Sequence, residues 1–247
     1  MDKTIRLNKF LSERLGVSRR EADDLISRGK IIVDDQKAIL GTRIDSKSKI
    51  FCNNKLVPFE NEYKYIAFHK PVGYVCSRRA QGSTPTLYDL LPAEFHKLKT
   101  VGRLDKDSSG LILLTNDGDF AFQMTHPKFR KTKVYEVELD RPLEPLHQQM
   151  ISDYGVMLDD GPSQFKIIKR LADSPLEDRK LGRAPLSVSE KGESQVSYEV
   201  ILTEGRNRQI RRTFAALGYK VTKLHRTHIG KYELGALKPG EYVIIEP

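Results

Sequence analysis

The sequence predicts an α+β protein, in which a small module of two helices and a few short strands precedes a larger unit built on a mainly antiparallel mixed sheet. Two observations predict this class. Helical spacing of apolar residues dominates only the start of the chain and a few later segments. The later strand-like segments follow in irregular order, unlike the regular alternation of a doubly wound parallel sheet. We place the domain boundary after residue 60, where polar residues follow Pro58, so the predicted domains are 1–60 and 61–247.

The first module is expected to open with a short helix. Leu7, Phe10, Leu11 and Leu15 fall at the spacing of one helix face. Gly16 follows at once, and glycine commonly ends a helix because it adopts the left-handed conformation without strain. These residues predict an amphipathic helix whose apolar face is buried.

A second helix and short strands complete the predicted module. Ser18 is followed three residues later by Glu21, the pattern of a capping box at a helix start. This helix is expected to end at Gly29. Short strands are expected at 30–33 and 49–52, separated by polar, turn-rich sequence.

The larger domain is expected to mix many strands with few helices. Strands are expected at 63–69, 110–115, 133–139, 165–169, 195–203 and 242–246. Helices are expected at 87–91, 118–124, 145–151 and 208–217. The polar segment 170–194 contains prolines and many charges, so we expect a mobile surface excursion there.

Composition narrows the class of protein. The 247 residues include 42 Lys and Arg against 33 Asp and Glu, a net charge of +9 that favours an anionic partner such as nucleic acid. Hydrophobic residues make up 38%, enough to argue against disorder throughout. No run approaches the roughly 18 apolar residues of a membrane span, and the charged N-terminus does not resemble a signal peptide. We therefore expect a cytoplasmic globular protein.

Common metal and cofactor motifs are missing. Two cysteines, Cys52 and Cys76, are too few for a disulfide framework or a cysteine-based zinc site. The six histidines are scattered, and no acidic residue at a ligand spacing accompanies them. Phosphate-binding and dinucleotide-binding glycine patterns are also lacking. We expect no metal and no cofactor, so carboxylates, hydroxyls and aromatic rings must carry any chemistry.

The densest polar cluster is the segment 101–110, which leads into the apolar run 111–115. A glycine-bounded polar loop beside a buried strand can hold a side chain rigidly at the floor of a cleft. Asp105 and Asp107 are the candidate carboxylates there. The alternative is a structural turn in which Arg103 pairs with a neighbouring acid.

The strongest charge bias lies in the segment 204–231, with eight cations and one acid. Ile210, Phe214 and Leu217 are spaced for the buried stripe of a helix, so we expect the cations to project from an anchored wall that suits phosphate groups. A solvated basic face is the alternative. The segment 126–133 adds a second basic loop.

Residues 6–35, RLNKFLSERLGVSRREADDLISRGKIIVDD, resemble the S4-type RNA-binding module first named in a ribosomal small-subunit protein. The resemblance implies that cations and the start of the second helix contact RNA phosphates, which suits the backbone donors of a helix N-terminus. A solvated helix face is the alternative. The RNA-binding residues so implied are Arg6, Lys9, Ser18, Arg19, Arg20 and Arg28.

The segment GRLDKDSSGLILLTNDG at 102–118 resembles the active-site segment of the pseudouridine synthases, in the branch that modifies ribosomal RNA. Three further segments fit that family in the same order. They are HKPVGYVCS at 69–77, KVYEVEL at 133–139 and EGRNRQIRRTFAALGYKVTKLHRTHIG at 204–230. The resemblance covers most of the chain except about 140–195, and it implies a synthase domain with the mainly antiparallel sheet described above.

The resemblance also implies roles for individual residues. Asp105 is implied as the essential catalytic carboxylate, and Arg211 as the partner that keeps it ionised. Tyr135 is implied to lie against the flipped uracil and to assist removal of its proton, with Ile210 lining the apolar side of the base. Arg103 is implied to fill the gap left by the flipped nucleotide.

The remaining assignments concern other arginines of the segment 204–231, the cofactor and the partners. Arg208 is assigned to substrate binding, and Arg206 and Arg212 to RNA binding. Isomerising uridine exchanges no electrons and releases no group, so no cofactor is required. Asp105 is expected to act either as a nucleophile or as a base, and both routes stay open. The expected partners are ribosomal RNA and ribosome assembly intermediates, without a membrane, and the expected state is a monomer.

The target subunit is a finer expectation. The runs NRQIRR at 207–212 and LDKDS at 104–108 resemble the large-subunit enzymes more than the small-subunit one. A non-catalytic ribosome-binding or assembly factor is the first alternative, and an isomerase of small-subunit RNA is the second. A hydrolase using Asp105 and Asp107 as paired acids is a third, but it lacks a supporting metal or sugar-cleft signature.

Overall fold

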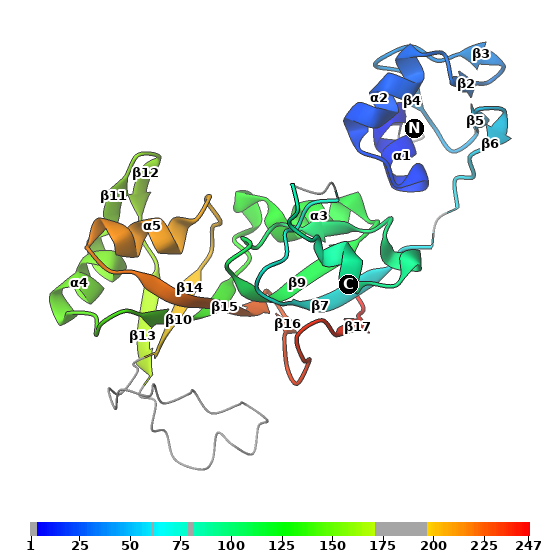
Figure 1. Cartoon of the computed structure of the whole chain (residues 1–247). Helices are drawn as coiled ribbons and strands as arrows, with labels where there is room; N and C mark the ends of the chain where they lie inside the picture. Colours follow the sequence, from blue (N-terminus) through cyan, green and yellow to red (C-terminus); the bar gives the residue numbers. More distant parts are fainter. Residues whose placement is uncertain (1–3, 61, 79–81, 171–196) are drawn as a thin grey trace.

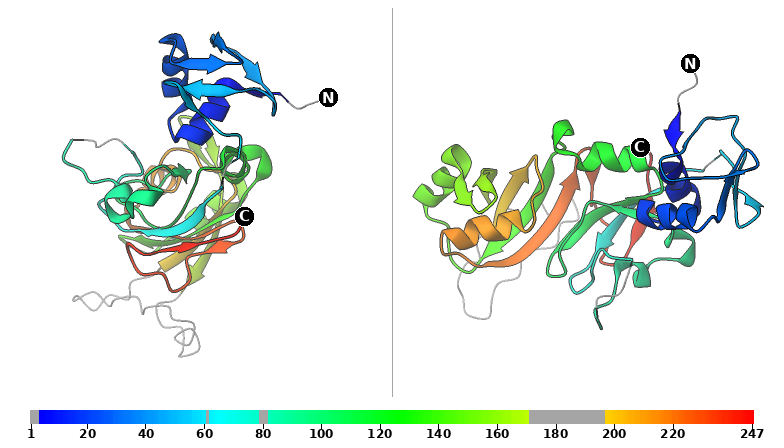
Figure 2. Two further views of the ribbon diagram at one scale, coloured as in Figure 1. Left: turned by 90° about the vertical axis from the view of Figure 1, so that its right-hand side faces the viewer. Right: turned by 90° about the horizontal axis from the view of Figure 1, so that it is seen from above.

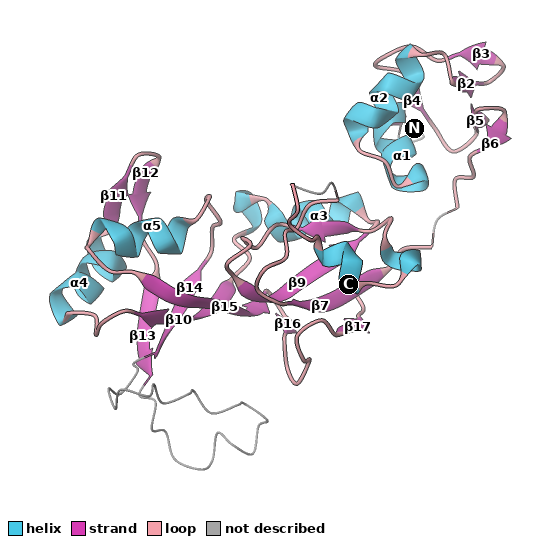
Figure 3. Cartoon of the chain, in the orientation of Figure 1, coloured by secondary structure: helices cyan, strands magenta, loops and turns pink. Residues whose placement is uncertain are grey.

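The computed structural model describes residues 4–60, 62–78, 82–170 and 197–247 (Figure 1). A small N-terminal unit is followed by a larger C-terminal unit built on a nine-stranded sheet (Figure 3). Within the described ranges the strands of this sheet pair antiparallel, except where β15 (Val221–Ile229) pairs parallel with β9 (Ser109–Thr115). The predicted α+β class with a mainly antiparallel mixed sheet is confirmed.

The N-terminal unit packs two short helices against short strands. Gly16 ends α1 in the left-handed conformation, with φ 69°. Ser18 and Glu21 form the predicted capping box at the start of α2, and both helices are confirmed. The elements in chain order are β1 (Ile5–Arg6), α1 (Leu7–Leu15), α2 (Arg19–Ser27), β2 (Ile31–Val33), β3 (Gln36–Lys37), β4 (Arg43–Ile44), β5 (Ile50–Cys52) and β6 (Lys55–Leu56).

The C-terminal unit arranges its main strands in the order β13-β14-β10-β15-β9-β7-β17, with β16 beside β15 and β8 beside β9. Helix α5 and the β11–β12 hairpin lie above the sheet in the view of Figure 1. The strands are β7 (Tyr65–Lys70), β8 (Lys99–Val101), β10 (Lys133–Leu139), β11 (Val156–Leu158), β12 (Gly161–Ser163), β13 (Lys166–Arg170), β14 (Ser197–Leu202), β16 (Tyr232–Glu233) and β17 (Tyr242–Ile244). The helices are α3 (Gly118–Thr125), α4 (Pro145–Gln149) and α5 (Gln209–Ala216), with the short helical turns η1 (Leu87–Leu90), η2 (Ala93–Phe95), η3 (Pro127–Phe129) and η4 (Met150–Tyr154).

Two predicted helices are shorter or less regular than expected. The segment 87–91 forms only the 3-10 turn η1, and the segment 145–151 passes from α4 into the π-helical turn η4. The predicted excursion at 170–194 lies, after its first residue, outside the described residues. The domain boundary after residue 60 stays a prediction.

No strand was predicted for the segment that forms β15, the longest strand among the described residues. Its buried residues are Val221, Leu224, Arg226 and Ile229, and this spacing does not alternate strictly. The pairing of β15 with β10 is interrupted twice by register shifts, which change the face on which following side chains lie. The alternation that identifies a strand in a sequence is therefore broken here.

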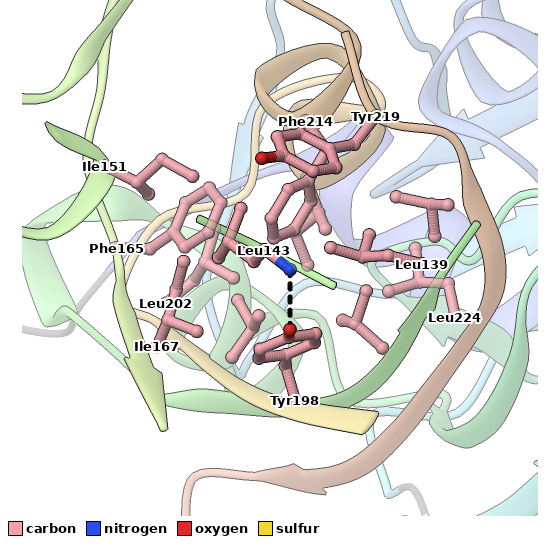
Figure 4. Close-up of a cluster of buried hydrophobic side chains, with 14 of the residues drawn as sticks. Leu139, Leu143, Ile151, Phe165, Ile167, Tyr198, Leu202, Phe214, Tyr219 and Leu224 are labelled. Atoms are coloured by element: carbon pink, nitrogen blue, oxygen red, sulfur yellow. Dashed lines mark hydrogen bonds between the residues drawn. The ribbon is translucent and has the colours of Figure 1, made fainter. Parts of the chain in front are cut away.

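The main core lies between α5 and the strands beneath it. Phe214 of α5 lies in one buried cluster with Phe165, Tyr198 and Leu224 (Figure 4). Ile210 of α5 belongs to the same cluster. The hydroxyl of Tyr198 accepts a hydrogen bond of 2.7 Å from the backbone N–H of Leu143 inside this core, so its polar end is satisfied.

Two further clusters cover the strands β7 and β9. Ile112 and Leu114 belong to one cluster, whereas Leu111 and Leu113 belong to the other. This alternation follows from the two-residue period of a strand. Tyr135 packs against both the main core and the cluster of Ile112, so it lies where two cores meet.

The N-terminal unit contacts the C-terminal unit through α1 (Figure 2). Lys9 Nζ lies 2.6 Å from Asp119 Oδ1, and Lys99 Nζ donates to Ser12 Oγ at 2.6 Å. Arg78 donates to the backbone oxygen of Gly16. Lys99 Nζ also donates to the backbone oxygen of Ser12 at 3.2 Å, so two cations of the C-terminal unit bind carbonyl oxygens in and just after the last turns of α1. None of the helices in the described part of the chain has the length and apolar character needed to traverse a bilayer.

Candidate active site

The loop between β8 and β9, residues 102–108, is held from its inner side by a buried lysine. Lys70 is 0% exposed, and its Nζ donates to the backbone oxygens of Pro71 at 3.0 Å, Asp105 at 3.0 Å and Ser108 at 2.7 Å. Burial lowers the pKa of Lys70. Lys70 has no predicted role, because a lysine beside a turn is usually exposed. The signal that could have found it is its position at the end of a strand that contains the apolar run 65–68.

A pair of arginines faces the carboxylates of this loop. Arg208 Nη1 lies 3.3 Å from Asp105 Oδ2, and the same guanidinium binds both carboxylate oxygens of Asp107 at 3.1 Å. Arg208 has left-handed backbone angles, φ 46° and ψ 32°, immediately before α5. Such angles are strained for a residue with a side chain and are often found at functional sites. The strained turn directs Arg208 toward the two acids.

Arg211 does not pair with Asp105 as expected. Its Nε lies 3.3 Å from Asp107 Oδ2, and its Nη2 donates to the Asp107 backbone oxygen at 2.8 Å. Burial alone would raise the pKa of Asp107, but the hydrogen bond from Arg208 and the charge of Arg211 outweigh it and lower that pKa. The ion pair expected between Arg211 and Asp105 is therefore made by Arg208.

One pocket of about 220 Å³ brings together five of the six residues predicted for catalysis or substrate binding, and Arg211 is the one that does not line it. Asp105 and Arg103 come from the 102–108 loop, Tyr135 from β10, and Arg208 and Ile210 from the start of α5. Leu104, Leu202 and Leu224 add apolar walls. A small pocket with one apolar side and a few charged groups suits a single planar base. Another pocket, of about 240 Å³, lies in the N-terminal unit beside Arg6 and shares no lining residue with the first.

Two cations predicted to bind RNA are engaged within the protein. Arg206 lies 3.1 Å from Asp160 Oδ1 and donates to the backbone oxygens of Gly161 and Pro162 at 3.0 and 2.8 Å. Arg212 lies 2.7 Å from Asp160 Oδ2. These bonds hold the turn of the β11–β12 hairpin against the start of α5, and direct RNA contact by either arginine stays a prediction.

The predicted RNA-binding residues of the N-terminal unit divide into two groups. Arg19 and Arg20 are exposed in the first turn of α2, next to the cap residue Ser18, and Arg6 is exposed at the start of α1. Lys9 is bound to Asp119, and Arg28 forms an ion pair with Asp24 at 3.0 Å. Arg28 is also exposed, but it lies at the end of α2. Arg19 and Arg20 therefore present cations at a helix N-terminus, where anions are favoured.

An exposed aromatic cluster on α3 and the following turn η3 was missed by the sequence-based predictions. Phe122 and Phe129 are 45% and 38% exposed, with ring centres 5.8 Å apart, and Lys128 Nζ lies about 5 Å from both rings. Thr125 of the same helix as Phe122 lies beside Gly102, and Lys133, four residues after Phe129, lies beside Gly205; both glycines line the pocket. Exposed rings among cations are suited to stacking with nucleic-acid bases.

No three His, Cys, Asp or Glu side chains gather into a metal-binding group within the described ranges. Cys52 and Cys76 are both free thiols. The Cys76 thiol is half-buried, and its Sγ lies 3.3 Å from both the backbone nitrogen and the oxygen of Leu104.

Two known protein families match different parts of the chain. The RNA pseudouridylate synthase family matches residues 64–216, and the S4 domain family matches residues 5–50. The first match contains the whole pocket except Leu224.

Relatives align with nearly the whole chain. A ribosomal small subunit pseudouridine synthase A from Pasteurella multocida is 34% identical over 96% of this chain and 94% of its own length. A ribosomal large subunit pseudouridine synthase B from Yersinia pestis is 32% identical over 93% of this chain and 68% of its own length. The crystal structure of a pseudouridylate synthase, 29% identical, superposes with a TM-score of 0.63 over 98% of this chain and 96% of that one.

Proposed function

This chain belongs to the RNA pseudouridylate synthase family, and on that premise we propose that it isomerises a uridine of ribosomal RNA with Asp105 as the essential carboxylate. One observation carries the assignment of the site. Asp105, Tyr135, Arg208 and Ile210, which come from segments far apart in the sequence, line a single pocket. An S4 domain ahead of the synthase domain supports an RNA substrate.

The reaction requires three changes in one bound nucleotide. The bond between C1′ of the ribose and N1 of uracil breaks, the base rotates, and C1′ forms a bond to C5. C5 then loses a proton and N1 gains one, so atoms and electrons balance within the nucleotide. Asp105 would act at the sugar, either as nucleophile on C1′ or as the base that removes a ribose proton.

The other side chains of the pocket would hold the base. Tyr135 would lie against the uracil and assist removal of the C5 proton, and Ile210 would cover its apolar side. Arg208, 3.3 Å from Asp105, would place a positive charge beside the reacting carboxylate. Arg103, exposed at the pocket edge, would occupy the gap left in the RNA, offsetting part of the cost of base flipping.

The RNA would extend beyond the pocket along two surfaces. Arg19 and Arg20 at the start of α2 would contact phosphates, together with Arg6. The aromatic cluster of Phe122 and Phe129 would meet a base near the target. We further propose the large-subunit RNA as the target, on the motifs at 104–108 and 207–212. Relatives of similar identity are named for either subunit, so small-subunit RNA is the alternative, and mapping modified uridines in cells lacking the protein decides between them.

The experiment that tests the site is tritium release from RNA labelled at C5 of uridine. We expect Asp105→Asn to lower release by at least about 1,000-fold, because the group that acts on the sugar is removed. RNA affinity should stay within a few-fold of wild type. Asp107→Asn is the matched control, since it removes a neighbouring carboxylate that also binds Arg208 but does not line the pocket.

The control should retain measurable release. Equal release by wild type and Asp105→Asn would remove Asp105 from the mechanism. No release by wild type on any ribosomal RNA fragment would contradict the proposed reaction.

A further inference from the structure

The nine-stranded sheet consists of two parts that meet along a very short contact. One part contains β13, β14, β10, β15 and β16, and the other contains β8, β9, β7 and β17. They are joined where His225 and Arg226 of β15 pair with Ser109 and Gly110 of β9. We call this contact the seam.

The seam lies between the two sets of pocket residues. Asp105 belongs to the loop that runs directly into β9, whereas Tyr135 lies on β10 and Arg208 precedes α5. The relative position of Asp105 and Tyr135 therefore depends on how the two parts of the sheet are fixed together. A small displacement matters, because a misplacement of about 1 Å can cost roughly 100-fold in rate.

Arg226 occupies the seam, and it is buried rather than exposed. It counts among the surface cations in the prediction for segment 204–231, yet only 3% of it is exposed. Its Nε donates to the backbone oxygen of Leu111 on β9 at 2.8 Å, and its Nη1 lies 3.4 Å from the hydroxyl of Tyr135. The guanidinium carbon lies 5.8 Å from the centre of the Tyr135 ring.

Burial of the Arg226 guanidinium calls for an explanation. Within the described residues no carboxylate pairs with Arg226, and its Nη2 has no hydrogen-bond partner. Burying a charged group without an opposite charge is unfavourable, so a better-packed apolar residue would stabilise the fold more. The side chain is retained at a point that touches β9 on one side and Tyr135 on the other.

The backbone at the same place is equally constrained. Gly110 has φ +108°, and a Cβ atom there would lie 2.6 Å from the backbone nitrogen of Arg226 and closer still to its backbone oxygen. The start of β9 therefore contacts the Arg226 backbone directly, while the Arg226 side chain reaches Leu111 one residue further along β9. Both contacts fix the strand that follows the Asp105 loop.

We propose that Arg226 is a positioning residue that sets the place of the Tyr135 hydroxyl relative to Asp105 by bridging it to β9. The rate measurements that test this proposal rest on the proposed function, whereas the NMR measurement of Tyr135 does not. Lysine at this position would keep the charge but lacks the fork that reaches both partners at once.

The test compares Arg226→Lys in the full chain with wild type, in both the Tyr135 and the Tyr135→Phe background. We expect Arg226→Lys to lower the single-turnover rate at saturating RNA by about 10- to 100-fold, with the Kd for RNA changed less than about 2-fold. In the Tyr135→Phe background, the same substitution should lower the rate by less than about 3-fold, because the hydroxyl it positions is gone. Arg141→Lys is the matched control, since Arg141 also faces a tyrosine ring, that of Tyr219 at 4.6 Å, away from the pocket.

A second measurement needs no turnover. Fluorine NMR of protein containing 3-fluorotyrosine, with the Tyr135 signal identified by its absence in Tyr135→Phe, should show that signal shifted or broadened by Arg226→Lys and unchanged by Arg141→Lys. Should Arg226→Lys not fold, Arg226→Gln is measured in the same way.

The outcomes separate the two proposals. An unchanged rate with a lower Tm, equal rate losses in both backgrounds, or an unmoved Tyr135 signal would each overturn the positioning role. An inactive wild type whose Tyr135 signal still responds to Arg226→Lys would instead overturn the proposed function and leave the contact established.

Discussion

At the residue scale, Arg208 shares one guanidinium between two carboxylates. Its two terminal nitrogens, Nη1 and Nη2, each bind Asp107 at 3.1 Å, and Nη1 also lies 3.3 Å from Asp105. The bidentate contact with Asp107 is the stronger of the two interactions, and it fixes the position of the arginine. Asp105 therefore faces a cation whose position is fixed by a neighbouring acid, and its second oxygen is not committed to that cation.

His225 gives the seam a dependence on pH. Its Nδ1 lies 2.9 Å from Ser109 Oγ, and burial, with smaller contributions from His69 and Lys223, lowers its pKa to about 4. In the unfolded chain a histidine has a pKa of about 6.5. Between these two pH values the unfolded state binds more protons than the folded state. The contribution of His225 to the free energy of unfolding is therefore fully present above pH about 6.5 and is lost as the pH falls toward 4.

We predict that His225→Gln flattens this part of the pH profile. The acid-dependent loss should shrink by on the order of 2 kcal/mol, a value reduced for the partial exposure of the ring. Glutamine can keep a hydrogen bond to Ser109 but does not take up a proton. Urea unfolding at a series of pH values from 7 to 4 measures the effect, and parallel profiles for the two proteins would contradict it.

Predictability differs among the site residues. Asp105, Tyr135 and Ile210 lie in segments that resemble a known family, so they could be named from the sequence, and the pocket brings them together. The partner of Asp105 was not predictable, because Arg208 and Arg211 lie one helical turn apart and the left-handed angles of Arg208 decide which one reaches it. Lys70 and Arg226 were not predictable, because burial of a cation leaves no sign in local residue patterns.

At the element scale, the joining of β9 to β15 depends on a glycine. We predict that Gly110→Ala destabilises the protein by roughly 3 kcal/mol or more, because its Cβ would collide with the Arg226 backbone. Gly240→Ala is the matched control. Its φ of +86° is also unfavourable for alanine, but nothing lies within 4 Å of the added atom, so only about 1–2 kcal/mol of stability should disappear.

Thermal and urea unfolding of the two variants measure the difference. Equal losses would show that backbone strain alone, rather than contact with β15, explains the need for glycine at 110. A larger loss for Gly110→Ala, together with a slower single-turnover rate in the folded protein, would support the importance of the seam.

Elements with a clear period were predictable, and those without one were not. Helix α1 has its apolar residues on one face and ends at Gly16, and β9 contains the uninterrupted apolar run 110–114, so both were predicted nearly to their ends. The strand β15 was missed because its register shifts against β10 break the alternation. The pairing of β15 with β9 joins segments more than 100 residues apart, which no local pattern encodes.

At the scale of the whole molecule, the N-terminal unit is held against the synthase domain by ion pairs and hydrogen bonds. Burial, and then the charge of Arg78, lowers the pKa of Lys99 at this contact. The two domains themselves were recognisable from the sequence, since each resembles a known family. Their mutual placement was not, because it depends on a few polar contacts such as Lys9 with Asp119.

We predict that deleting residues 1–60 weakens binding to ribosomal RNA and makes it less dependent on salt. For single-stranded RNA, removing one lysine–phosphate or arginine–phosphate interaction should reduce the slope of log K against log salt by about 0.7. Chemistry on a minimal RNA should persist, because the pocket lies outside this unit. Binding titrations at several salt concentrations test this, with circular dichroism to show that the truncated protein folds, and an unchanged affinity and slope would refute the role.

The three carbonyl oxygens gathered around Lys70 have a consequence for how the enzyme responds to its substrate. The shape of the 102–108 loop is set when the chain folds, since the ammonium joins Pro71, Asp105 and Ser108 before any RNA arrives. Little reorganisation of this loop is then needed when a nucleotide enters, and preorganisation of this kind is a major source of rate acceleration in enzymes. At this loop we therefore expect the RNA, rather than the protein, to change shape when the target uridine enters the pocket.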